Sequence, residues 1–233
     1  MTEAAARREG LPLLLAASVA AGLIYPLAWN AGLPEAALIL LKGAGVGLLA
    51  ACAALRARSA DGWLLAAVMA FGALGDVLLE IRFEAGVAAF AVGHLAAIAL
   101  YRRNRRATTT GSQRALAMLL PLFGLAMPFL LLGNDRQVIG LAIYSLLLTV
   151  MAATAWVSRF SRYRAGIGAL MFVASDTLIA ARMGPLAGNE FVSYAVWLLY
   201  YLGQLLIFLG VSEALARQPH VPNSVIPAKA GTQ

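Results

Sequence analysis

The chain has 233 residues, of which 61% are hydrophobic and 12% are charged, and its mean hydropathy is +0.80. These values lie far outside the range of soluble globular domains, so the composition predicts an integral membrane protein. The net charge of +7 would suggest an acidic partner in a soluble protein. In a membrane protein the positions of the charges matter more, and we expect no nucleic-acid partner.

Eight apolar runs are long enough to cross about 30 Å of hydrocarbon, which takes roughly 20 helical residues. In chain order they cover approximately 11–29, 34–55, 62–80, 85–101, 115–132, 137–157, 165–182 and 190–215. The sequence therefore predicts an all-α polytopic membrane protein, a single bundle of eight transmembrane helices. The first run follows Arg7 and Arg8, as a signal peptide would, but it has no clear small-x-small cleavage site. We expect it to be retained as a helix.

The cations are distributed unevenly between the two ends of these helices. With a cytoplasmic N-terminus, fourteen fall on the cytoplasmic side and three on the other, while the eighteenth, Lys42, lies inside the second run. This bias predicts that both termini are cytoplasmic. The cytoplasmic set is Arg7, Arg8, Arg56, Arg58, Arg102, Arg103, Arg105, Arg106, Arg114, Arg159, Arg162, Arg164, Arg217 and Lys229, and the opposite set is Arg82, Arg136 and Arg182.

The expected organisation is a cytoplasmic segment over 1–10, a membrane domain over 11–217 and a disordered tail over 218–233. The tail contains three prolines and no apolar period. The one cysteine, Cys52, excludes an intrachain disulfide and offers no metal-ligand spacing. No dinucleotide, Walker, zinc-protease or serine-hydrolase motif is present. We therefore expect no cofactor and no metal.

A few costly polar side chains remain inside the apolar runs, where a charged group is typically paired or functional. They share one approximate depth. With a rise of 1.5 Å per residue, Asp76 and Asp176 lie about 22 and 18 Å from the cytoplasmic surface, and Lys42, His94 and Tyr200 lie about 12–16 Å below the outer one. The full set is Lys42, Asp76, Glu80, His94, Asp176, Tyr200, Tyr201 and Gln204.

Each of these residues also has an ordinary structural explanation. Lys42 can extend toward the outer interface or pair with a carboxylate. Glu80 can be explained as a residue at the membrane interface that faces Arg82. His94 can be explained as a histidine buried in the packing between helices. The two tyrosines and Gln204 fit packing aromatics and an interhelical hydrogen bond.

For the two aspartates the structural explanation is weaker, because a single lysine cannot fully neutralise two acids. Two carboxyls that share one cation in a low dielectric should differ in proton affinity. Such a pair suits acid–base chemistry, in which one carboxyl donates a proton and the other orients water or stabilises a cation.

Four segments carry a family resemblance: GDVLL at 75–79, GHLAAIALY at 93–101, GALMFVASDTLIA at 168–180 and YYLGQLLI at 200–207. Together with Lys42 they resemble the YhhN-like lysoplasmalogenase family over about residues 11–215. Two features depart from that family: Gly43 replaces the proline that often follows the lysine, and the surroundings of His94 have Gly93 and Ala97 instead of alanine and an aromatic residue.

The resemblance implies an ether hydrolase that cleaves the vinyl-ether bond of lysoplasmalogens to a fatty aldehyde and glycerophosphoethanolamine or glycerophosphocholine. Vinyl-ether hydrolysis passes through an oxocarbenium ion, which carboxyl pairs also manage in glycosidases. Asp76 and Asp176 would be the catalytic pair. Lys42, His94, Tyr201 and Gln204 would orient them or the phosphate of the lysophospholipid, and Tyr200 and Glu80 complete the candidate set. The expected location is the inner membrane of a bacterium.

Two other functions fit part of the pattern. A proton-coupled transporter or lipid carrier also uses intramembrane carboxylates with His and Lys, although the two halves of the chain show no repeat. A zinc-dependent amidase would need about three N, O or S ligands, and His94 is the one histidine within the apolar runs.

Overall fold

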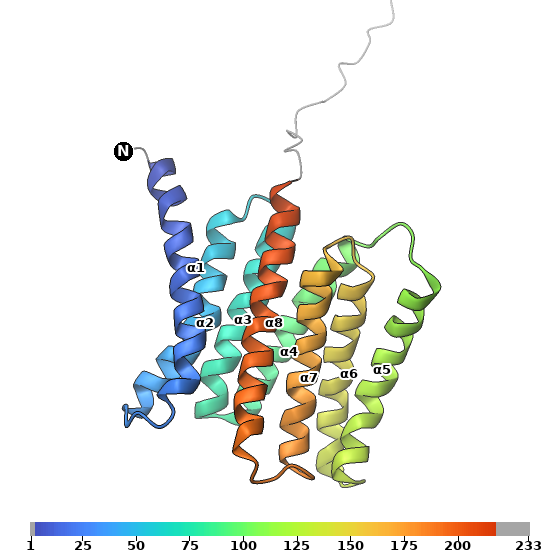
Figure 1. Ribbon diagram of the computed structural model, residues 1–233. Helices are drawn as coiled ribbons and strands as arrows, with labels where there is room; N and C mark the ends of the chain where they lie inside the picture. The colour runs from blue at the N-terminus through green and yellow to red at the C-terminus, as the bar shows by residue number, and fades with distance from the viewer. Residues whose placement is uncertain (1–2, 218–233) are drawn as a thin grey trace, which may run out of the picture.

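A computed structural model describes the backbone of residues 3–217 and the side chains of residues 11–217 except Gln137. The described residues form eight long α-helices and one short π-helical turn, labelled η1 (Figure 1). In order these are α1 (Glu3–Ala28), α2 (Glu35–Arg56), α3 (Ala60–Ile81), α4 (Phe83–Arg103), α5 (Gly111–Leu132), α6 (Arg136–Trp156), η1 (Arg162–Gly166), α7 (Ile167–Arg182) and α8 (Glu190–Ala216).

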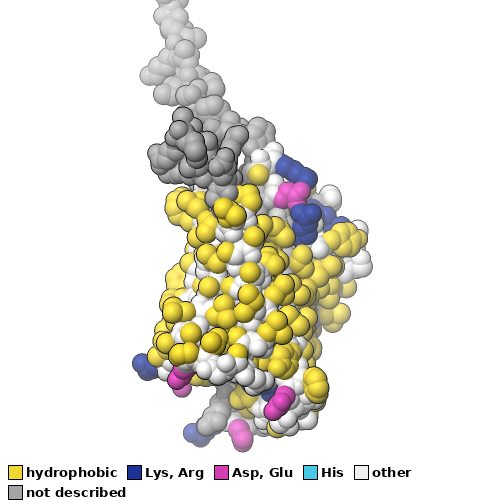
Figure 2. All heavy atoms as spheres, turned by 60° about the vertical axis from the view of Figure 1, so that its left-hand side comes forward, with side chains coloured by type: hydrophobic (Ala, Val, Ile, Leu, Met, Phe, Trp, Pro, Cys, Tyr) yellow, Lys and Arg dark blue, Asp and Glu magenta, His cyan; other side chains and the backbone are white. Residues whose placement is uncertain are grey.

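The eight predicted spans are confirmed, since each coincides with one helix to within a few residues, apart from the N-terminal extension of α1. Within the described residues, all eight helices have the length and apolarity needed to cross a membrane. Figure 2 shows a broad band of hydrophobic side chains on the face in view, with the charged side chains gathered toward the two ends of the bundle. The chain is a multi-pass membrane protein.

The chain reverses at every loop, so the start of α1 and the end of α8 lie at the same end of the bundle (Figure 1). The loops after α2, α4 and α6 lie there too, and these loops together with the adjoining helix ends carry most of the arginines. The C-terminal tail predicted over 218–233 lies outside the described residues.

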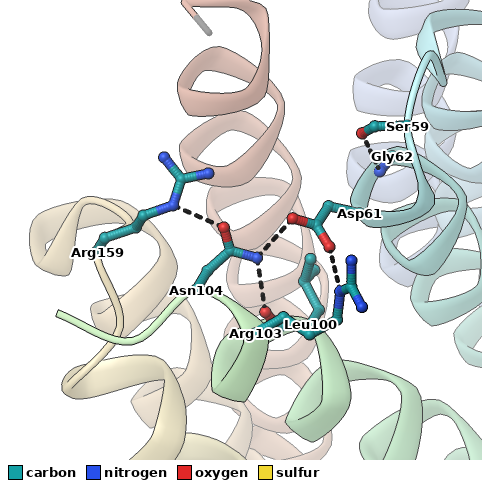
Figure 3. A network of polar contacts seen from close by, with 7 residues as sticks. All are labelled: Ser59, Asp61, Gly62, Leu100, Arg103, Asn104 and Arg159. Carbon is teal, nitrogen blue, oxygen red and sulfur yellow. Dashed lines mark hydrogen bonds and ion pairs between the residues drawn. The ribbon is translucent and has the colours of Figure 1, made fainter. Parts of the chain in front are cut away.

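A polar cluster ties the arginine-rich end together (Figure 3). Asn104, just after α4, donates from Nδ2 to Asp61 Oδ2 at 2.8 Å and to the Leu100 carbonyl at 2.9 Å. Its Oδ1 accepts from Arg159 Nε at 2.6 Å, and Arg103 Nε donates to Asp61 Oδ1 at 2.7 Å. The start of α3, the end of α4 and the segment before η1 are thereby fixed relative to one another.

Helix α8 holds the two halves of the bundle together. It packs against α1, α2 and α3 on one side and against α7 and η1 on the other, while α4 contacts α6. As a result, α3, α4, α6, α7 and α8 all border one interior region. The largest buried side chains include Tyr101, Tyr201, Phe160 and Phe208.

Helices α7 and α8 cross where two glycines face each other. A Cβ added to Gly168 would lie 2.5 Å from the Gly203 carbonyl oxygen, and a Cβ added to Gly203 would lie 2.7 Å from the Gly168 carbonyl oxygen. Neither backbone can yield without separating the helices. The crossing therefore depends on residues that lack a side chain, as is common in membrane bundles.

We expect Gly168→Ala to destabilise the protein by about 1–3 kcal/mol, because the added methyl group overpacks this crossing. Gly140→Ala in α6 is the matched control. A Cβ there meets nothing within 4 Å, so the change should be neutral or stabilising by up to about 1 kcal/mol. Thermal unfolding of both variants in detergent measures the difference. Equal stability of the two variants would contradict the close packing of α7 and α8.

Candidate functional site

Asp76 is held inside the bundle by a tyrosine from another helix. It lies on α3 and is only 2% exposed, and Tyr200 Oη on α8 donates a hydrogen bond to its Oδ2 at 2.8 Å. Two glycines on α3 make room for side chains of α8 and α4 around Asp76. Gly72 lies beside the Tyr200 hydroxyl, and Gly75 packs directly on the ring of Phe90. The polar contact that α8 offers to Asp76 is thus a phenol, which stays neutral and can donate one proton.

Asp176 has an equivalent partner on a different helix. Tyr144 Oη on α6 donates to Asp176 Oδ2 at 3.0 Å, and the same hydroxyl lies 3.3 Å from His94 Nε2 on α4. A phenol has one proton, and here the carboxyl receives it. With Asp176 ionised, the second bond, between Tyr144 and His94, then uses a proton on Nε2 of the imidazole. His94, which is 3% exposed, reaches Asp176 through Tyr144.

Aromatic rings fill the space between these two hydrogen-bonded groups. The Phe172 ring on α7 meets the Tyr200 ring edge-to-face at 5.1 Å and the His94 ring at 5.0 Å between centroids. Phe90 on α4 adds edge contacts to Phe172 and Tyr200 at 5.9 and 5.7 Å. The result is one packed layer in which the groups around Asp76 and Asp176 lie on either side of Phe172. Among the hydrogen bonds of the described residues, none joins the two carboxyls.

Lys42 and Glu80 form an ion pair near the end opposite the arginine-rich loops. Lys42 Nζ lies 2.5 Å from Glu80 Oε1, and the side chains are 12% and 40% exposed. Glu80 therefore pairs with Lys42, not with the neighbouring Arg82 that the sequence suggested. Both charges also lie within electrostatic reach of Asp76. Among the described residues, the lysine pairs with Glu80, one turn along α3 from Asp76, and with neither aspartate.

Two adjacent tyrosines of α8 have different surroundings. Tyr201 faces α1, where its hydroxyl lies 3.0 Å from Ser18 Oγ and its ring covers Gly22. Consecutive helical residues point about 100° apart, so Tyr201 cannot share the Asp76 side with Tyr200. Gln204, one turn after Tyr200, does share that side, and its Nε2 and the Tyr200 hydroxyl both lie beside Gly72. Of the predicted set, Tyr201 lies apart from the aspartates.

Tyr144 is the polar site residue that the sequence interpretation missed. It lies eight residues after the start of α6 at Arg136, about 12 Å from the end of the bundle opposite the arginine-rich loops. That is the depth at which Lys42 was noted, so the same criterion applied to α6 would have found it. Phe90 and Phe172 gave no such signal, because phenylalanines are abundant in apolar helices.

The described residues contain no group of three His, Cys, Asp or Glu side chains placed to hold one metal ion. Cys52 is buried, with its sulfur facing the Leu11 carbonyl at 3.9 Å. His94 and Gln204 are the two predicted residues that line a small internal cavity. The site is therefore a set of carboxyl, phenol, imidazole and amide groups, suited to moving protons and orienting water.

Comparison with known proteins places these residues in a family. Residues 37–211, which include every candidate site residue, match the model of the YhhN family. Proteins of Mycobacterium bovis and Mycobacterium tuberculosis, each named "Lysoplasmalogenase", are 33% identical over 157 residues, which is 64% of this chain and 59% of theirs. The chain thus spans about three fifths of the length of these relatives. No solved structure matches. The extent of the match over the membrane domain shows that the chain belongs to the YhhN family.

Proposed function

We propose that this protein hydrolyses the vinyl-ether bond of lysoplasmalogens and releases a long-chain aldehyde and glycerophosphoethanolamine or glycerophosphocholine. One structural observation carries the proposal. Two aspartates from different helices lie within the bundle, and each accepts a hydrogen bond from a tyrosine of yet another helix. Membership of the YhhN family and the similarity to two proteins named lysoplasmalogenase support the choice of substrate.

The reaction needs one proton donor and one proton acceptor. A carboxylic acid transfers its proton to the outer alkenyl carbon, and the electron pair of the double bond forms the new C–H bond. The resulting oxocarbenium ion takes up water at the carbon attached to oxygen, while a carboxylate removes a proton from that water. The hemiacetal then collapses to the aldehyde and the glycerol hydroxyl, so one water is consumed.

In this proposal Asp76 and Asp176 are the acid and the base. Tyr200 and Tyr144 hold their carboxyls in place through hydrogen bonds of 2.8 and 3.0 Å. His94 positions Tyr144 through its Nε2, and Gln204 lies beside Tyr200 near Gly72. The rings of Phe90 and Phe172 line the same layer and offer an apolar surface to the alkenyl chain.

Lys42 and Glu80 suit the polar end of the substrate. Their ion pair lies at the end of the bundle opposite the arginine-rich loops, beyond Asp76 along α3. A lysophospholipid with its head at that surface places its ether bond some way below it. Lys42 would then attract the phosphate, in keeping with its charge.

The arginine bias orients the protein in the membrane. We propose that the arginine-rich end and both ends of the chain face the cytoplasm, and that the membrane is the inner membrane of a bacterium. The domain organisation proposed is a membrane domain over 11–217, with residues 1–10 and 218–233 on the cytoplasmic side.

Reporter fusions test this orientation. Fusions after Arg106, before α5, and after Gly133, before α6, should report opposite sides, with the first cytoplasmic, because one helix separates the two positions. Activity of a cytoplasmic reporter at Gly133 alone would mean an inverted bundle. The same side for both would mean that α5 does not cross the membrane.

A lipid panel tests the activity. Purified protein should release aldehyde from a lysoplasmalogen and none from the saturated 1-alkyl lysophospholipid with the same head group, because only the alkenyl carbon can accept a proton. Failure to release aldehyde from any lysoplasmalogen would reject the hydrolase. A flux driven by a pH gradient in that case would indicate a proton-coupled transporter or lipid carrier.

A further inference from the structure

One cavity lies where α3, α4, α6, α7 and α8 meet. Its volume is about 10 Å³, and its walls include Val68 and Gly72 of α3, Ala97 of α4 and Met151 of α6. Three polar side chains also line it: His94, Tyr101 and Gln204. The cavity lies farther along α4 than the layer of the two aspartates, toward the arginine-rich end, because Tyr101 lies about two turns after His94 and close to the end of α4 at Arg103.

Two of these side chains carry buried polar atoms with no hydrogen-bond partner among residues 3–217. They are the Tyr101 hydroxyl and Gln204 Oε1, and their side chains are 0% and 2% exposed. The amide of Gln204 is oriented by its other end, since Nε2 lies beside Gly72 on the side of the Tyr200 hydroxyl. Its oxygen is therefore the free end. Leaving two such atoms unpaired in a buried site is costly.

Water meets the requirements of this cavity. A volume of about 10 Å³ accommodates roughly one water molecule, and a buried water needs two to four polar partners. Water can donate to Gln204 Oε1 and either donate to or accept from the Tyr101 hydroxyl. An apolar occupant would leave both atoms unpaired, and a larger polar one would not fit.

We propose that this cavity is a binding site for one water molecule held by Tyr101 and Gln204. One residue near each proposed catalytic aspartate lines the site: Gln204 on the Asp76 side and His94 on the Asp176 side. Gln204 lies beside Tyr200, which donates to Asp76, and His94 is joined through Tyr144 to Asp176. The single water thus lies between Gln204, beside the Asp76 group, and His94, in the Asp176 group.

Resting on the proposed function, this water serves the hydrolysis. Each turnover consumes one water, and the aspartates lie among apolar helices and lipid. A water stored beside His94 and Gln204 replaces the one consumed without crossing the hydrocarbon on the lipid side. Variants that fill the cavity should therefore slow turnover while leaving both carboxyls in place.

X-ray radiolysis followed by mass spectrometry tests the site itself, because hydroxyl radicals formed from a bound water oxidise the side chains next to it. Met151 lines the cavity and is 1% exposed, whereas Met69 is 0% exposed and does not line it. In the full-length protein in detergent, Met151 should be oxidised severalfold faster than Met69. Equal rates for the two methionines would overturn the water site.

Cavity-filling variants link the site to activity. Ala97→Val narrows the cavity, and Ala99→Val places the same group on the exposed side of α4. Ala97→Val should reduce Met151 oxidation to the rate of Met69 and reduce aldehyde release severalfold, whereas Ala99→Val should leave both unchanged. Loss of Met151 oxidation with full turnover would overturn the role in hydrolysis.

The wild-type measurement does not depend on whether Ala97→Val folds. Rapid Met151 oxidation without any aldehyde release would reject the proposed hydrolase and leave the water site standing. Aldehyde release with equal oxidation of Met151 and Met69 would do the opposite.

Discussion

Asp76→Asn should lower the rate of aldehyde release by about 10²–10⁴, the usual contribution of a general acid or base. Asparagine keeps the shape of the side chain, and its amide oxygen can still accept the hydrogen bond from Tyr200 that Asp76 receives at 2.8 Å. What it loses is the ionisable carboxyl, which can give up or take up a proton during the reaction. The measurement is turnover per folded molecule, with folded protein quantified by thermal unfolding of the same detergent-purified sample.

Asp135→Asn is the matched control for this substitution. Asp135 lies just before α6, is exposed, and makes no side-chain capping hydrogen bond there. Its replacement should leave turnover within about twofold of wild type, because surface substitutions away from special contacts have small effects. A structural role for Asp76 predicts a different result: less folded protein, with normal turnover for each folded molecule.

Asp176→Asn should cause a loss of similar size, although its surroundings differ. Tyr144 can still donate to the amide oxygen, so the hydrogen bonds through Tyr144 to His94 are retained. Members of one catalytic unit are strongly non-additive. The variant with both substitutions should therefore be little slower than either single variant.

If the losses of activation free energy from the two substitutions added up in the double variant, the paired role would be contradicted. Multiplication of two 10²–10⁴ effects would mean that Asp76 and Asp176 act in separate steps or at separate places. Steady-state turnover of the four proteins on one lysoplasmalogen provides the comparison.

The sequence was sufficient to predict the spans, because each is a long apolar run and the length of a transmembrane helix is set by the thickness of the bilayer. The depth of the polar residues also followed from the sequence, since rise per residue is nearly constant along a helix. Asp76, Asp176, His94, Tyr200 and Gln204 were all identified in this way, and the structure places them around one interior region.

Contacts across helices could not be predicted in the same way, because they depend on how each helix is rotated toward its neighbours. Tyr200 and Tyr201 have almost the same depth, yet one reaches Asp76 and the other reaches Ser18 on α1. Lys42 and Glu80 pair because α2 and α3 pack side by side in a register that the sequence alone does not reveal.

The hydrogen-bond partner of Asp176 could not be predicted from the sequence either. The depth of Tyr144 could be read from the sequence, but its helix has no charged residue in its interior and its contacts with other helices could not be read in that way. Its importance comes from its position between His94 and Asp176, 50 residues away in one direction and 32 in the other. The role of a residue that joins two others can be identified only when the positions of both are known.

Hydrolysis of a lysoplasmalogen in D₂O, followed by mass spectrometry of the aldehyde, examines the proposed chemistry at the reacting atoms. Wild-type protein should give an aldehyde with one deuterium on the carbon next to the carbonyl, because the acid that protonates the alkenyl carbon exchanges with solvent. Asp76→Asn should give the same labelled product about 10²–10⁴ times more slowly. Aldehyde without solvent deuterium, or equal rates for the two proteins, would contradict protonation of the vinyl ether by this carboxyl pair.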